Sequence, residues 1–196
     1  MRVSRQQAAA HRQKILDAAG TLFRQHGFDG IGVADIMKDA GLTQGGFYGH
    51  FSSKNDLAAE TCARVLGNEG WAERVAGTPR PSFEAVVRGY LSARHRNDPG
   101  HGCLLAALGA DVARQPKSVR RAFTDGLRAR VDALRNLLPA GRSEAVRRRK
   151  ALAAMAGLVG ALVLSRAVDD PKLSDEILAA AATMVGATTQ RTAASR

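Results

Sequence analysis

The residues with the most informative chemistry lie between Thr43 and Lys54. The amide of Gln44 places a hydrogen-bond donor beside an acceptor, which matches the edge of an adenine base. Lys54 stands at the start of an expected helix, where its charge adds to free backbone N–H groups that attract phosphate. Gly45 and Gly46 are adjacent, although each glycine costs a helix about 1 kcal/mol relative to alanine. These groups have the chemistry to hydrogen-bond to base edges and to phosphate.

Signatures of catalysis are missing from the sequence. There is no His-Glu-x-x-His motif, Lys117-Ser118 lacks the glycines of a phosphate-binding loop, and Gly27 to Gly32 has the wrong spacing for a dinucleotide. We therefore expect no enzyme activity, no cofactor and no metal site. An enzyme is one alternative class of function, and a constitutive or architectural DNA-binding protein without an effector is another.

The charge of the chain is strongly positive but does not mark the segment between Thr43 and Lys54. Lys and Arg number 29 against 18 Asp and Glu, a formal net charge of +11, which favours a polyanionic partner. Residues 1–60 hold seven basic and six acidic side chains, so most of the excess lies downstream.

Cysteine usage and hydropathy favour a soluble cytoplasmic protein with no membrane association. The only cysteines are Cys62 and Cys103, too few for a secreted disulfide framework. The N-terminal segment is polar and has no apolar stretch typical of a signal peptide. The longest apolar run, Ala151 to Leu164, is shorter than the roughly 20 residues that span a bilayer.

Apolar residues recur at helical spacing along almost the whole chain, which predicts an all-α fold. Thr43 is expected to cap a short helix over 44–50, and Ser53 to cap a longer one that runs to about Ala76. The other expected helices are 11–26, 33–40, 83–94, 103–115, 116–138, 143–166 and 174–189.

The first three helices follow the helix-turn-helix plan, in which a short helix enters the major groove of DNA. The residues that carry the pattern are Ile15-Leu16 with Ala18-Ala19, Leu22-Phe23, Gly27-Phe28, Asp35-Ile36, Ala40-Gly41-Leu42, Gly45 to Phe51, Ser53-Lys54 and Leu57. Over roughly residues 11–60 this string closely resembles the DNA-binding domain of TetR-family transcriptional regulators of the TetR/AcrR type. The alternative interpretation is a small three-helix core with two aromatic plugs.

The resemblance implies a helix-turn-helix DNA-binding domain over 1–53, a connecting helix over 54–76, and an effector-binding and dimerisation domain over 54–196. It also implies DNA contacts on and around the recognition helix, 44–50, to base edges, groove wall and backbone; they are Thr43, Gln44, Gly45, Gly46, Phe47, Tyr48, His50 and Lys54. Phe47 is expected to meet a thymine methyl group, whereas Phe51 and Leu57 are expected to pack the recognition helix onto the next one. Gly46 and Gly32 depart from the family, which commonly has Ser or Thr at both positions.

The segment from Ala151 to Leu164 is apolar on every face and needs two burial partners. Small residues at Ala153, Gly157 and Ala161 let another helix approach closely, and the last helix offers further alanines and glycine. Two such helices from each of two chains predict a four-helix homodimer interface. The alternative is a core helix within one chain.

An apolar cavity for an effector of unknown identity is expected between the DNA-binding head and the dimer helices. Its candidate lining residues are Trp71, Phe83, Tyr90, Leu104, Leu108, Phe123 and Met155, each of which is otherwise simple core. Cys103, expected in the first turn of a helix, is a candidate sensor thiol or a small packing residue, and Cys62 is expected to be structural. Together these features predict a homodimeric repressor that binds a double-stranded DNA operator and is released by a small-molecule or thiol-reactive effector.

Overall fold

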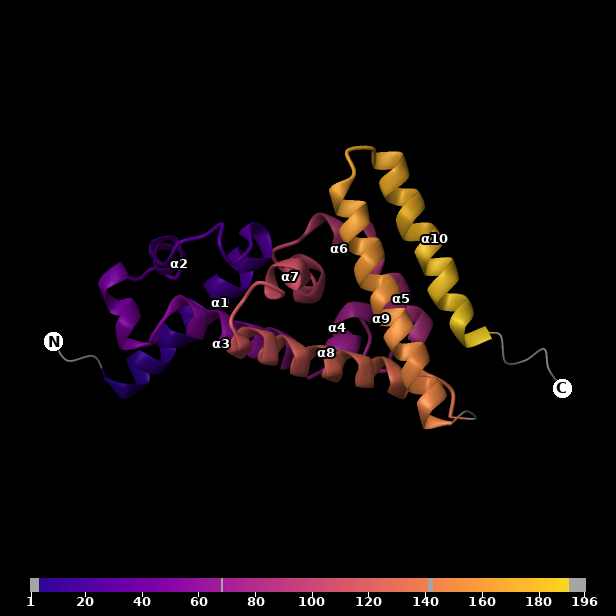
Figure 1. Cartoon of the computed structure of the whole chain (residues 1–196), viewed down its shortest axis with the longest axis horizontal. Coiled ribbons are helices and arrows are strands. Elements are labelled where there is room, and N and C mark those ends of the chain that lie inside the picture. Colours follow the sequence, from indigo (N-terminus) through magenta and orange to yellow (C-terminus); the bar gives the residue numbers. More distant parts are fainter. Residues whose placement is uncertain (1–3, 68, 141–142, 191–196) are drawn as a thin grey trace. The chain divides into compact units, whose positions relative to one another are not determined.

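The computed structural model describes residues 4–67, 69–140 and 143–190, and all regular elements in this part of the chain are helical (Figure 1). The predicted all-α fold is confirmed. The helices are α1 Arg5–His26, α2 Val33–Asp39, the 3₁₀ helix η1 Gln44–Gly49, α3 Lys54–Gly67, α4 Trp71–Ala76, α5 Phe83–Tyr90, α6 Ala93–Asn97, α7 Leu104–Val112, α8 Lys117–Leu137, α9 Glu144–Ala167 and α10 Pro171–Gln190.

The chain folds into two compact units. The first comprises the chain up to Gly67 together with Pro99–Gly126, and the second comprises residues 69–98 and the chain from Leu127 onward. The predicted domain limits, 1–53 and 54–196, placed every residue after 53 outside the DNA-binding domain. They also include residues 1–3 and 191–196, which lie outside the described part of the chain.

Helix α1 begins six residues before the predicted start. The Ser4 hydroxyl accepts a hydrogen bond from the backbone N–H of Gln7 at 3.1 Å, and the Gln7 side-chain oxygen accepts one from the Ser4 N–H at 2.9 Å. This reciprocal capping box satisfies two backbone donors that a helix otherwise leaves free. At the other end Gly27 takes a φ of 76° and stops the helix, as predicted.

The core of the first unit is built from α1, α2, η1 and α3. Its largest buried side chains include Ile15, Phe23, Ile36, Phe47, Phe51 and Leu57. The segment that precedes α7 is fastened to α1, because the Arg24 Nε donates a hydrogen bond to the Gly100 carbonyl at 2.6 Å. Pro99–Gly126 therefore packs with the N-terminal helices.

Two of the predicted helices are divided in the structure. The expected helix from Ser53 to Ala76 is α3 followed by α4, with Gly70 in the left-handed region at a φ of 69° immediately before α4. The expected helix over 83–94 is α5 followed by α6. Ser92 caps α6, since its hydroxyl accepts from the His95 N–H at 3.2 Å.

The start predicted for the last helix, at Ser174, is wrong. Helix α10 begins at Pro171, a residue that suits a first helical turn because it has no N–H to leave unsatisfied. Ser174 lies inside the helix and is buried, and its hydroxyl donates to the Ser165 carbonyl at 2.6 Å. Ser174 therefore joins α10 to α9 rather than starting a helix.

In the second unit, α9 and α10 lie side by side as an antiparallel pair (Figure 1). A side chain added at Gly157 would place its Cβ 3.1 Å from Val185 Cγ2 and 3.4 Å from Met184 Cε. Gly157 therefore brings α9 close to α10 of the same chain. Ala161 is buried, so the predicted stripe of small residues does not form one continuous face toward a second chain.

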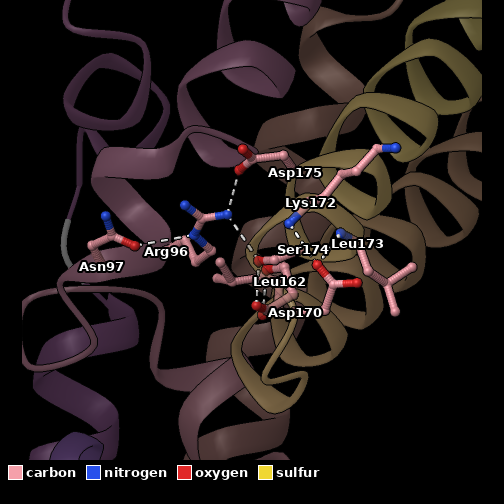
Figure 2. A network of polar contacts seen from close by, with 9 residues as sticks. Arg96, Asn97, Leu162, Asp170, Lys172, Leu173, Ser174 and Asp175 are labelled. Atoms are coloured by element: carbon pink, nitrogen blue, oxygen red, sulfur yellow. Dashed lines mark hydrogen bonds and ion pairs between the residues drawn. The ribbon is translucent and has the colours of Figure 1, made fainter.

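A polar network fastens α6 to the α9–α10 pair (Figure 2). Arg96 donates hydrogen bonds to the Ser174 hydroxyl at 2.8 Å and to the Asp175 carboxylate at 2.6 Å. From α9, Arg166 donates to the backbone carbonyls of His95 at 2.7 Å and Arg96 at 3.0 Å. The bonds from Arg166 satisfy two backbone carbonyls of α6, a helix of five residues whose last carbonyls have no partner within the helix.

Helix α9 is, by length and composition alone, the one helix in the described residues that is long and apolar enough to cross a membrane. It buries Ala151, Met155, Leu158 and Leu162, and it packs against α10. Burial within the chain therefore accounts for only part of the apolar surface of this 24-residue helix.

Candidate nucleic-acid interface

The element that the sequence singles out, η1, is a 3₁₀ helix of six residues between α2 and α3. Thr43 precedes it in an extended conformation, and the Thr43 hydroxyl makes no capping hydrogen bond to η1. The predicted cap is therefore wrong. The hydroxyl is exposed, so it is available to a partner outside the chain.

Polar and aromatic side chains of this segment point outward. Thr43 and Gln44 are exposed, Tyr48 keeps 75% of its surface accessible, and His50 and Lys54 are half-buried. A phenol ring exposed to this degree serves no purpose in the core of the unit. The structure thus gathers these five predicted contact residues on one short helix and its two flanks.

Phe47 differs from the other predicted contact residues. It is completely buried, and its ring stacks on that of Phe51 with the centroids 5.8 Å apart and an angle of 28° between the planes. The ring is enclosed within the first unit, so the predicted contact with a thymine methyl group is wrong. Phe51 and Leu57 are buried, as predicted.

The adjacent glycines of η1 are not required by packing inside the protein. A Cβ added at Gly45 would meet no heavy atom within 4 Å, and one added at Gly46 would only touch Met37 Cε at 3.7 Å. Neither glycine has a positive φ. Because nothing inside the chain forbids a side chain here, the glycines fit a surface that another molecule approaches closely.

The start of α3 is capped from both sides. The Ser53 hydroxyl accepts from the Asp56 N–H at 3.0 Å, which confirms the predicted cap. The Asp56 carboxylate accepts from the backbone N–H of Ser52 at 3.2 Å and from its hydroxyl at 3.0 Å. Lys54 lies in this first turn, beside backbone N–H groups that favour an anion.

His50 lies at the end of η1 next to other cationic groups. Partial burial lowers its pKa below the usual value of 6.5, and the nearby charges of His11 and Arg12 lower it further. The His11 ring meets the His50 ring edge-on, with the centroids 6.2 Å apart. At neutral pH His50 is therefore mainly uncharged, and it offers a partner a hydrogen bond rather than a positive charge.

The candidate effector residues divide between the two units. Leu104, Leu108 and Phe123 belong to the first, whereas Trp71, Phe83, Tyr90 and Met155 belong to the second. Of these, Leu104, Leu108, Phe83, Tyr90 and Met155 are buried.

One feature of the second unit was missed by the sequence analysis. Arg130 is 6% exposed, and its guanidinium lies 5.1 Å from the centre of the Trp71 ring. Trp71 in turn meets Tyr90 edge-on at 6.4 Å. Arg130 therefore lies on the buried side of α8, against the ring of Trp71.

The two cysteines have different environments. Cys62 is buried in α3, and burial raises its pKa to about 12, so the thiol does not ionise near neutral pH. Cys103 is half-exposed and occupies the N-cap position of α7, so it lies immediately before the first turn in which it was predicted.

Comparisons with known proteins agree with this geometry. The family model for bacterial regulatory proteins of the tetR family matches residues 15–61, which include α2, η1 and most of α1 and α3. The HTH-type transcriptional regulator AcrR of Shigella flexneri is 44% identical over 72 residues, which cover 37% of this chain and 34% of AcrR. The HTH-type transcriptional repressor NemR of Escherichia coli K12 is 26% identical over 138 residues, 67% of this chain and 68% of NemR. The aligned part thus spans about a third of AcrR and two thirds of NemR.

Solved structures share the fold over nearly the whole chain. The reduced form of E. coli NemR has a TM-score of 0.72 and 22% identity and covers 89% of this chain and 94% of its own. A TetR-family regulator from Cytophaga hutchinsonii has a TM-score of 0.72 and 17% identity, with 95% and 97% covered. A matching helix-turn-helix segment, regulators among the relatives and a shared helical fold lead to one conclusion: residues 15–61 match the tetR family of bacterial regulatory proteins, and the chain has the fold of TetR-family transcriptional regulators.

Proposed function

We propose that this protein is a cytoplasmic, homodimeric repressor that binds a double-stranded DNA operator and is released by a small-molecule or thiol-reactive effector. The observation that carries the proposal is the exposed η1 segment, whose adjacent glycines have no role in packing and whose flanks present Gln44 and Lys54. Relatives that include NemR are transcriptional repressors, which supports repression.

In the proposed complex η1 enters the major groove. Thr43 and Gln44 meet base edges, the backbone at Gly45 and Gly46 lies against the groove wall, and the side chains of Tyr48, His50 and Lys54 bind the DNA backbone. Because a dimer carries two such helices, its operator is a pair of half-sites arranged as an approximate palindrome.

The surface of the α9–α10 pair supports the dimer. Leu164 keeps 56% of its surface exposed and Met184 keeps 63%, values typical of an interface seen in one chain alone. The other exposed apolar residues of these helices include Leu152, Ala153, Ala156, Val163, Leu173, Ala180 and Ala187. A second copy that covers this surface with its own α9 and α10 gives the predicted four-helix interface.

Cys103 is the candidate for thiol-reactive release. It is half-exposed at the N-terminus of α7, within reach of a reagent from solvent, whereas Cys62 is buried. Helix α7 belongs to the first compact unit, and the loop before it is hydrogen-bonded to Arg24 of α1. A change at Cys103 therefore acts on the same unit that contains α2, η1 and α3. Trp71, Tyr90, Leu108, Phe123 and Met155 stay candidates for contact with a non-covalent effector.

The first experiment selects bound duplexes from a random DNA pool and measures affinity across salt concentrations. We expect a palindromic site and binding that weakens with salt, because cationic groups release condensed counterions. Lys54→Ala removes one phosphate contact from each subunit, so it should reduce the slope of log affinity against log salt by about 1.8 for the dimer, and Gln44→Ala should change base preference with little change in slope. Equal affinity for the selected and a scrambled duplex at physiological salt would contradict the proposal.

The second experiment titrates operator release with a mild electrophile or peroxide. Release of the wild type and of Cys62→Ser, but not of Cys103→Ser, is the expected pattern. If Cys103→Ser is released as readily as the wild type, or if no thiol reagent releases the wild type, the effector is non-covalent and Cys103 is a packing residue.

A further inference from the structure

The recognition helix η1 is poorly equipped to hold its own shape. Three of its six residues are glycine, and its 3₁₀ hydrogen bonds have weaker geometry than those of an α-helix. Phe47 is its one buried side chain. Its orientation in the unit therefore depends on the groups that hold Phe47 and the residues just after the helix.

Those groups converge on Arg12 of α1. Phe47 stacks on Phe51. The Arg12 guanidinium lies over the Phe51 ring, 4.6 Å from its centre. The same guanidinium forms an ion pair with the Glu60 carboxylate on α3. Arg12 thus joins α1, the end of the recognition helix and α3.

The neighbouring residue strengthens the same junction. His11 meets His50 edge-on. Burial makes the largest contribution to the lowered pKa of His50, and the charges of His11 and Arg12 lower it further. Two consecutive residues of α1 therefore contact the two residues that follow η1. This arrangement fixes the C-terminal end of η1 from one side.

A planar guanidinium is suited to this position. It stacks on an aromatic ring while its edge donates to a carboxylate, whereas a lysine ammonium makes the ion pair but cannot stack. The Arg12 and Glu60 side chains are both more than one third exposed, so the ion pair alone adds little to the stability of the fold. The two contacts together do more to orient η1 than to hold the unit folded.

We propose that Arg12 is a positioning residue for sequence readout: by bridging Phe51 and Glu60 it sets the angle at which η1 presents Thr43 and Gln44 to the bases, and it does not itself bind a phosphate. This inference rests on the proposed operator binding. The role proposed for Arg12 affects base recognition and leaves phosphate neutralisation unchanged. A tilted recognition helix loses contacts to the bases, while the number of neutralised phosphates stays the same.

The test compares the affinity of each variant for the selected palindromic duplex and for a scrambled duplex of the same composition, over several salt concentrations. The variants are Arg12→Ala, Arg12→Lys and Glu60→Gln, and Lys14→Ala is the matched control because it removes an exposed cation from the same helix. Circular dichroism and thermal unfolding are recorded for each variant, so that a loss of folding is recognised.

We expect Arg12→Ala to lower the ratio of selected to scrambled affinity at least tenfold with an unchanged salt slope and an intact fold. Glu60→Gln, which keeps the size of the side chain, should lower the ratio by a smaller factor, and Arg12→Lys should recover part of it. Lys14→Ala should leave the ratio unchanged. If Arg12→Ala does not fold, the ratios of Glu60→Gln and Arg12→Lys decide the question.

Three results would overturn the inference. A salt slope reduced by about 1.8, that is about 0.9 for each subunit of the dimer, with an unchanged ratio makes Arg12 a phosphate contact. An equal loss of both affinities together with a lower unfolding midpoint makes its role purely structural. Unchanged ratios in all three variants remove any role. A wild type that does not distinguish the two duplexes would instead refute the proposed function, and the inference with it.

Discussion

Glycine at positions 45 and 46 weakens η1, and the packing of the chain offers no reason for it. Open space surrounds the Cβ position of Gly45, and only a flexible methionine end approaches that of Gly46. The cost in local stability supports the proposed close contact of this surface with DNA. At the same scale, Phe47 shows that neighbours in sequence have opposite roles, because its ring finds a partner in Phe51.

Gly45→Ala and Gly46→Ala should separate folding from binding. We expect the free energy of unfolding to stay the same or rise by up to about 1 kcal/mol, since alanine restricts the unfolded chain and meets no steric conflict. Operator affinity should fall, because each methyl group keeps the backbone away from the groove wall. Chemical unfolding and operator titration of the same samples measure the two effects. A variant that binds the operator as tightly as the wild type would show that the glycine at that position is not needed for close approach to DNA.

At the scale of elements, close backbone approaches decide how the short helices of the second unit pack. A Cβ added at Gly89 of α5 would lie 2.0 Å from the Val75 carbonyl oxygen of α4, a contact that only a backbone shift can relieve. A Cβ added at Gly160 of α9 would meet no heavy atom within 4 Å. The two helical glycines thus have opposite structural roles.

Gly89→Ala should lower the free energy of unfolding of the second unit by about 2 to 3 kcal/mol, the range typical of overpacking. Gly160→Ala is the matched control and should raise it slightly through better helix propensity. Urea unfolding followed by fluorescence of Trp71, the chain's single tryptophan and a member of this unit, measures both. Equal midpoints for the two variants would contradict the packing of α5 on α4.

His95 makes the same unit sensitive to acid. Burial lowers its pKa, and the charge of Arg166 lowers it further, against the opposing effects of the Tyr90 hydrogen bond and the Asp98 charge. The Tyr90 carbonyl only accepts, so the His95 Nδ1 carries the proton in this 2.7 Å bond. Protonation therefore occurs at Nε2, and it is less favourable in the folded than in the unfolded chain.

The unfolded chain consequently takes up a proton before the folded one does, so stability falls as the pH drops below about 6.5 and levels off below the lowered pKa. The slope cannot exceed about 1.4 kcal/mol per pH unit for one histidine. His95 is the sole histidine of the second unit in the sequence, so Trp71 fluorescence during urea unfolding at pH 7.5, 6.5 and 5.5 isolates its effect. His95→Asn keeps a donor for Tyr90 and should flatten this dependence; an equally steep loss in that variant would exclude His95 as its source.

At the scale of the whole molecule, the proposed dimer rests on the exposed apolar residues of α9 and α10. Gly157 is a poor site to test it, because a large side chain there strikes Val185 and Met184 of the same chain and disrupts the helix pair itself. Leu164 lies two turns further along α9 and is more than half exposed. A charge at Leu164 therefore acts on the dimer without entering the core.

We expect the wild type to sediment as a dimer and Leu164→Arg to sediment as a helical monomer with much weaker operator binding, because an unpaired cation is costly inside an apolar interface. Ala129→Arg adds the same group to an exposed position of α8 and should leave the dimer intact. Analytical ultracentrifugation and circular dichroism distinguish the species. A Leu164→Arg protein that remains dimeric would place the interface elsewhere.

The sequence by itself determined what depends on near neighbours along the chain. Helical periodicity, the stop at Gly27, the cap at Ser53 and the residue string around η1 predicted the fold class and the DNA-binding segment, because helix hydrogen bonds and caps join residues only three or four positions apart.

The tertiary structure decided what depends on contacts between distant residues. It buried Phe47 against Phe51, turned Gly157 toward α10, packed Pro99–Gly126 with the N-terminal helices and brought Arg12 to Glu60. Periodicity shows that a helix has an apolar face but does not identify the helix that covers that face, and it leaves the direction of a single aromatic ring in a six-residue helix open. Those choices follow from the free energy of burying each surface against one particular neighbour, which exists only in the folded chain.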